Sequence, residues 1–107
     1  MSEHLVVLIT AGSQEEAERV AGALVMGRLA ACANVIPGVT SIYRWDGQIQ
    51  QDQEWLLVVK SQQAVLEDLV ECVQELHSYD VPEIIALPVT GGSKAYLDWI
   101  DQEVPGQ

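Results

Sequence analysis

Residues 30–60, which read AACANVIPGVTSIYRWDGQIQQDQEWLLVVK, decide the fold of this chain. Asp46 and Gly47 lie near the middle of the stretch and predict a two-residue hairpin turn, because a type I′ turn needs positive φ at both central positions. Each flanking arm is about fourteen residues long, whereas a typical strand has about five or six. The stretch therefore predicts one overlong β-hairpin. Pro37 and Gly38 should bend or bulge its first arm, since proline cannot donate to a strand ladder.

Apolar patterns outside the hairpin predict the other elements. A continuous apolar run at 4–10 predicts a first strand. Ser13 and Glu16 form a capping box at the start of a helix. Ser61 is expected to cap a second helix, whose apolar residues recur at helical spacing. The last two predicted elements are a strand bounded by prolines and a short helix, at 81–89 and 94–103.

The order βαββαβ followed by a helix is that of the split βαβ, ferredoxin-like fold. We therefore predict one α+β domain over residues 1–107, a sandwich of two helices on a four-stranded antiparallel sheet with spatial strand order 4-1-3-2. The long hairpin would leave the second strand as an exposed apolar edge. Such an edge invites pairing with another copy of the chain. If each copy gives its hairpin to the next, a closed ring results, and we predict a homotrimer.

Composition excludes several classes of function. The net charge of −11 argues against a nucleic-acid partner, because phosphate contacts need a basic face, and it also disfavours anionic membranes. No apolar run approaches the roughly 20 residues of a membrane span. The first residues lack the positive region of a secretory signal, so we expect a cytoplasmic location, with Cys32 and Cys72 as reduced thiols. No nucleophile, phosphate-loop or metalloprotease motif is present, and no enzymatic activity is expected.

Five segments of the chain resemble the CutA divalent-cation tolerance proteins. They are LAACANV at 29–35, SIYRWDG at 41–47, EWLLVVKS at 54–61, YDVPEII at 79–85 and GSKAYLDWI at 92–100. Together they cover nearly the whole chain in the family's order. The resemblance implies a ferredoxin-like fold, a tight homotrimer in a bacterial cytoplasm and binding of divalent metal, copper above all. It also implies a role in metal tolerance and an architecture similar to that of the PII signalling trimers.

His77 and Cys32 are the candidate metal ligands. Cys32 matches the family's alanine-alanine-cysteine motif, and a thiolate is a soft ligand for copper or zinc. His77 is expected just after a helix, where a neutral ring nitrogen could bind copper or another divalent cation. The copper-associated positions of the family are otherwise changed here, to Ile9, Leu76 and Ser78. The alternatives are a buried thiol and a surface histidine, and no metal is expected to be required for folding.

Tyr43, Trp45, Lys60, Tyr79 and Glu83 form a second candidate site. They match family motifs on the hairpin and at the start of the fourth strand, and in a ring they would converge at a subunit boundary. An aromatic wall with one cation and one carboxylate could hold a small polar ligand. This is the basis of an alternative function, that of a PII-like small-molecule sensor. The other interpretation is interface packing, where tyrosine and tryptophan are common.

Overall fold

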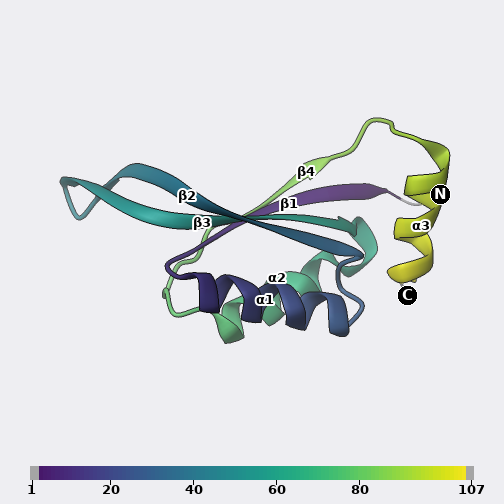
Figure 1. Cartoon of the computed structure of the whole chain (residues 1–107), viewed down its shortest axis with the longest axis horizontal. Helices are drawn as coiled ribbons and strands as arrows, with labels where there is room; N and C mark the ends of the chain where they lie inside the picture. The colour runs from purple at the N-terminus through teal and green to yellow at the C-terminus, as the bar shows by residue number, and fades with distance from the viewer. Residues whose placement is uncertain (1–2, 106–107) are drawn as a thin grey trace.

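The computed structural model describes residues 3–105 and has the predicted order of elements (Figure 1). These are β1 (His4–Ala11), α1 (Gln14–Met26), β2 (Cys32–Trp45), β3 (Gln48–Gln62), the short 3₁₀ helix η1 (Gln63–Val65), α2 (Leu66–Leu76), β4 (Ile84–Pro88) and α3 (Lys94–Glu103). The single domain predicted for residues 1–107 extends beyond the described residues at both ends.

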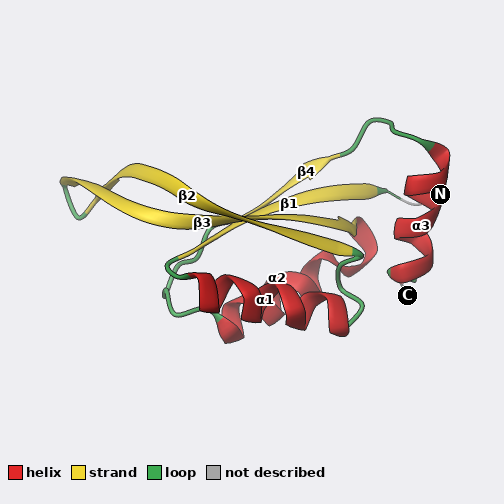
Figure 2. Ribbon diagram, viewed as in Figure 1, coloured by secondary structure: helices red, strands yellow, loops and turns green. Residues whose placement is uncertain are grey.

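One antiparallel sheet has the strand order β2-β3-β1-β4, as predicted. Helices α1 and α2 lie on the same side of it, and α3 lies at one end (Figure 2). Side chains alternate between the two faces of a strand, so every second residue of β1 faces the helices. The core forms there, and its largest fully buried side chains are Ile9, Leu24, Leu57 and Leu69. Burying a side chain of this size contributes about 1.5–3 kcal/mol.

The overlong hairpin is confirmed. Strands β2 and β3 pair as far as Trp45 with Gln48, and the turn residues Asp46 and Gly47 have φ of 54° and 77°. The pairing of β3 with β1 ends at Trp55, so the remaining part of the hairpin projects beyond the sheet (Figure 1). The predicted bulge is also present, as a register shift between Ile36 and Val39.

Two local predictions are wrong. Ser61 does not cap α2, because β3 continues to pair with β1 through Gln62. The Ser61 Oγ instead donates to the Leu29 carbonyl oxygen at 2.6 Å, and α2 has no side-chain cap. The fourth strand is shorter than residues 81–89, because it pairs only with Leu5 to Ile9 of β1 before the chain diverges from the sheet.

The face of the sheet opposite α1 and α2 carries an apolar surface, which we call the open sheet face. It consists of the alternate residues of β1 and their ladder neighbours on the other strands: Val6, Leu8, Ile36, Leu56, Val58, Ile85 and Leu87. Ile85 is 51% exposed and Leu87 is 45% exposed. An extended apolar surface of this kind usually marks an interaction site.

Candidate functional site

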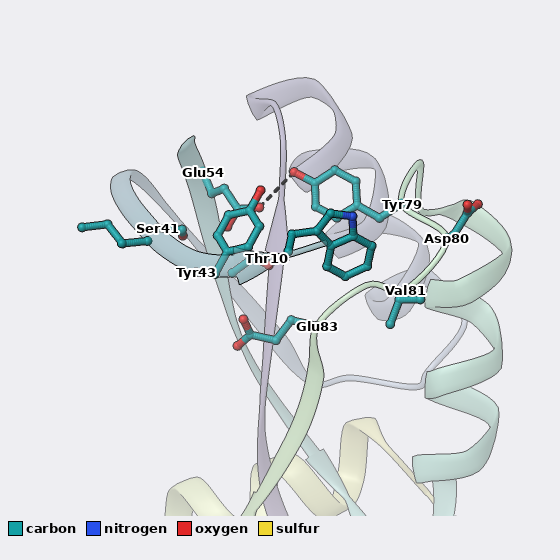
Figure 3. Close-up of a pocket in the computed structure, with 10 residues that line it drawn as sticks. Thr10, Ser41, Tyr43, Glu54, Tyr79, Asp80, Val81 and Glu83 are labelled. Carbon is teal, nitrogen blue, oxygen red and sulfur yellow. Dashed lines mark hydrogen bonds between the residues drawn. The ribbon is translucent and has the colours of Figure 1, made fainter. Parts of the chain in front are cut away.

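A pocket with a volume of about 580 Å³ lies between the projecting hairpin and the segment that leads into β4 (Figure 3). Four of the five predicted cleft residues line it: Tyr43, Trp45, Tyr79 and Glu83. The hairpin supplies the first two and the segment before β4 supplies the others. The volume falls within the range of sites that bind small molecules.

Lys60 does not join this pocket. It lies on β3 opposite Cys32, and its ammonium group donates to the Asn34 side-chain oxygen. Glu54, the β3 residue that does line the pocket, is six positions earlier, or about 20 Å at 3.3 Å per strand residue. Within one chain, the predicted aromatic wall and carboxylate are therefore brought together without the predicted cation.

Glu54 and Tyr79 form a polar contact within the lining of the pocket. The Tyr79 hydroxyl donates to Glu54 Oε2 at 2.9 Å, and Glu54 is only 8% exposed. Burial, this hydrogen bond and the charge of Glu54 raise the pKa of Tyr79 to about 12. Tyr79 therefore remains a neutral hydrogen-bond donor at physiological pH.

Gly12 makes room for this contact. A Cβ atom at this position would lie 2.9 Å from the Tyr79 hydroxyl oxygen, which is closer than real Cβ contacts allow. Glycine at the end of β1 thus lets the tyrosine reach Glu54. Neither Gly12 nor Glu54 was identified from the sequence. The available signal was the carboxylate of Glu54 two and four positions before Leu56 and Val58, which share its face of β3.

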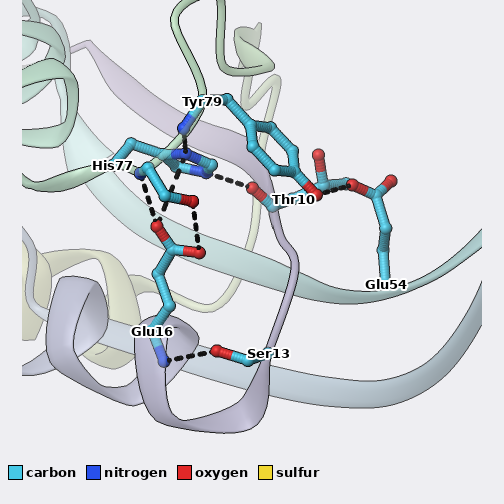
Figure 4. A network of polar contacts seen from close by, with 7 residues as sticks. Thr10, Ser13, Glu16, Glu54, His77 and Tyr79 are labelled. Carbon is cyan, nitrogen blue, oxygen red and sulfur yellow. Dashed lines mark hydrogen bonds and ion pairs between the residues drawn. The ribbon is translucent and has the colours of Figure 1, made fainter.

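His77 lies in a buried polar network and not on the surface (Figure 4). Its Nε2 is 2.6 Å from the Thr10 carbonyl oxygen, and its Nδ1 accepts from the Tyr79 backbone amide at 3.1 Å. A carbonyl can only accept and an amide can only donate, so in this arrangement Nε2 donates and Nδ1 accepts. Neither nitrogen has a free lone pair with which to bind a metal.

Glu16 completes this network. The predicted capping box is half formed, because Ser13 Oγ accepts from the Glu16 backbone amide at 3.1 Å. The Glu16 carboxylate, however, accepts from the Ser78 backbone amide at 2.6 Å and from its hydroxyl at 3.1 Å. Burial alone would raise the pKa of Glu16, but these hydrogen bonds and the nearby His77 ring outweigh burial and lower it.

The lowered pKa predicts acid sensitivity that depends on Glu16. Because the unfolded state binds the proton more readily, stability is lost as pH falls below the ordinary value of 4.5. We expect Glu16→Gln to be less stable than wild type by about 1–2 kcal/mol at neutral pH, with a smaller difference near pH 3. Urea unfolding at one protein concentration measures the difference in stability at both pH values. The exposed neighbour Glu15→Gln should show no such difference, and a pH-independent difference for Glu16→Gln would refute the assignment.

Cys32 and His77 are far apart within one chain. Cys32 is half-buried at the start of β2, opposite Lys60. His77 contacts Thr10, which pairs with Leu56, four positions from Lys60 and so about 13 Å along β3. Among residues 3–105, no group of three or more histidine, cysteine, aspartate or glutamate side chains could hold a metal ion. A single chain therefore does not fit copper at the two predicted ligands.

The chain resembles known proteins in both sequence and structure. The family model described as CutA1 divalent ion tolerance protein matches residues 5–103. The chain belongs to the CutA1 family. The curated CutA1 relatives include the divalent-cation tolerance protein CutA of Thermus thermophilus, 55% identical over 95 residues that make up 89% of this chain and 92% of the relative. The chloroplastic CutA protein of Arabidopsis thaliana is 48% identical over 90% of this chain, which spans only 53% of that relative's length.

Solved CutA1 structures share the fold. The divalent cation tolerance protein of Thermus thermophilus superposes with a TM-score of 0.91 at 52% identity, covering 96% of this chain and 98% of that one. The rice CutA1 structure has a TM-score of 0.92 at 42% identity, covering 94% and 93% of the two chains. These likenesses confirm the predicted α+β, ferredoxin-like fold. Within the described part of the chain, no helix is long and apolar enough to cross a membrane.

Proposed function

We propose that this CutA1 family member acts as a homotrimer in the response to divalent cations, copper above all, and that it binds its metal weakly and catalyses no reaction. The observation that carries the proposal is the family match over residues 5–103, together with the 55% identical Thermus relative whose name describes divalent-cation tolerance. Both cysteines are free thiols, which supports a cytoplasmic location as part of the same proposal.

The open sheet face supports the trimer. Seven apolar side chains share that face, and the outer edge of β2 has no strand partner within the described chain. An unpaired edge and an uncovered apolar face both favour association with identical copies. In a ring of three copies, each projecting hairpin could pair with the free edge of a neighbour and cover its apolar face.

Cys32 is the better of the two predicted metal ligands. Its thiol is half-buried at the sheet edge, where copies would meet, and it donates over a long distance of 4.0 Å to Asn34 Oδ1. His77 can bind metal only if it releases Thr10 or the Tyr79 amide. We therefore place a weak copper site at the interface between copies, with Cys32 as a ligand and His77 as a structural residue.

Native mass spectrometry during a Cu(II) titration tests both parts of this proposal. We expect a trimer that takes up one copper per chain, loses this uptake in Cys32→Ser and retains it in His77→Ala. The second cysteine provides the matched control, because Cys72→Ser should behave as wild type. Loss of copper in His77→Ala alone would make the histidine the ligand. Equal, non-stoichiometric uptake by all variants would mean that copper binds only non-specifically to the acidic surface.

A second candidate function is that of a PII-like small-molecule sensor. The observation that favours it is the pocket of about 580 Å³, which four of the five predicted cleft residues line. A pocket of this size can enclose a small metabolite. The binding measurements with choline described in the next subsection test this candidate.

A further inference from the structure

The lining of the pocket is aromatic and acidic. Its three rings are those of Tyr43, Trp45 and Tyr79, and its three carboxylates are those of Glu54, Asp80 and Glu83. No lysine, arginine or histidine is among the residues that line it. This composition selects against anionic ligands and favours a positively charged one.

Glu54 and Glu83 lack a basic counter-ion within the described chain. The contacts within 4.0 Å between basic nitrogens and carboxylate oxygens among residues 3–105 join His4 to Asp101, His77 to Glu16 and Lys94 to Asp98. Glu54 uses Oε2 for Tyr79, which leaves its second oxygen for a ligand. Glu83 lines the same pocket (Figure 3). Partial burial and the charge of Glu54 raise the pKa of Glu83, so a cation between the two carboxylates would relieve an unfavourable interaction.

The aromatic side chains distinguish an organic cation from a metal ion. A divalent metal needs several close ligands, and calcium takes six to eight oxygens. Residues 3–105 contain no cluster of three metal-ligating side chains. Aromatic faces, in contrast, attract alkylated ammonium groups through their π-electrons. Three rings beside two carboxylates match the second kind of ligand.

Contacts within the chain hold the Tyr79 ring in place without a ligand. The Tyr79 hydroxyl is held by Glu54, its backbone amide donates to His77, and its ring centroid lies 4.7 Å from that of His77. Gly12 leaves the space that this position of the ring requires. A preorganised wall reduces the entropy lost on binding.

We propose that this pocket binds a small organic ammonium ion, with Glu54 and Glu83 balancing its charge and the rings of Tyr43, Trp45 and Tyr79 contacting its alkyl groups. The proposal supplies the ligand class for the sensor function. Cys32, the copper ligand proposed above, is not among the side chains on which it rests, so it is independent of the copper site.

Isothermal titration calorimetry with choline and its neutral isostere, in which carbon replaces the nitrogen, tests the proposal. The two probes have nearly the same shape and differ in charge. We expect choline to bind at least about tenfold more tightly. Glu83→Gln should weaken choline binding by about tenfold or more, and Trp45→Leu should do the same. The matched control is Glu67→Gln, which removes an exposed carboxylate from α2 and should leave binding unchanged.

Three results would overturn the proposal. Equal binding of choline and its isostere would mean that the pocket recognises the apolar shape of the ligand and not its charge. Stoichiometric binding of Mg²⁺ or Cu²⁺ that displaces choline and is lost in Glu83→Gln would make it a metal site. No choline binding, with Glu83→Gln weakening the oligomer, would mean that a cationic side chain of a second copy fills the pocket. Cys32→Ser should bind choline normally, which separates failure here from failure of the copper proposal.

Discussion

His77→Ala is expected to lower the free energy of unfolding by about 2–4 kcal/mol. The substitution removes a buried hydrogen bond to the Thr10 carbonyl and a partly buried one from the Tyr79 amide. It also leaves the buried Glu16 carboxylate without the ring beside it, at 3.7 Å, and opens a cavity in a closely packed region. Urea unfolding at a fixed protein concentration, with and without Cu(II), measures the effect.

The second histidine of the chain provides the control. His4 is more exposed than His77 and contacts the Leu97 carbonyl oxygen at 3.2 Å and Asp101 at 2.8 Å. His4→Ala should therefore cost about 1 kcal/mol or less. Equal losses in the two variants would contradict a special structural role for His77. Stabilisation of wild type by Cu(II) that disappears in His77→Ala would show that the ring leaves its network to bind metal.

Ile85→Asp is expected to dissociate the proposed trimer, with the apparent dissociation constant rising by about a hundredfold or more. Ile85 lies on the open sheet face beside Leu8, and the ring would bury one aspartate from each copy there. Val25 is 43% exposed on α1, so Val25→Asp makes a similar change on the helical side. Sedimentation velocity over a dilution series should show a monomer for the first variant and a trimer for the second. If Ile85→Asp stays trimeric as Val25→Asp does, the copies associate through another surface.

Elements with local signals were predictable from the sequence. Asp46 and Gly47 specify their turn through backbone conformation alone, and Pro37 weakens a ladder wherever it lies. Hydrophobic spacing and the element order then leave few topologies for a chain of this length. Ser61 was misassigned because its conformation depends on a contact with a part of the chain that is distant in sequence. A serine before a helix resembles a cap, but pairing with β1, which lies far away in sequence, extends the strand past it.

The site was only partly predictable. Family motifs identified Tyr43, Trp45, Tyr79 and Glu83, but the burial of His77 depends on the Thr10 carbonyl, 67 positions away. No local pattern reports such a contact. The misplacement of Lys60 has a simpler cause, since spacing along a strand separates it from Glu54 by about 20 Å. Residues that match the motifs of one family need not lie close together in space within a single chain.

The bulge in β2 has a consequence for how the pocket tolerates changes in chain length. Before it, the even-numbered residues Cys32 and Ile36 face the open side of the sheet. After it, the odd-numbered Tyr43 and Trp45 do so. The reason is that the three residue steps from Ile36 to Val39 on β2 lie opposite only two residue steps on β3. Loss of one residue between Ile36 and Val39 would leave two steps on each strand, so the bulge would disappear while Val39 stayed opposite Glu54 and both rings kept their face. An alignment gap of one residue at this point in a relative therefore marks the loss of the bulge and its bend, and it is compatible with an intact aromatic wall.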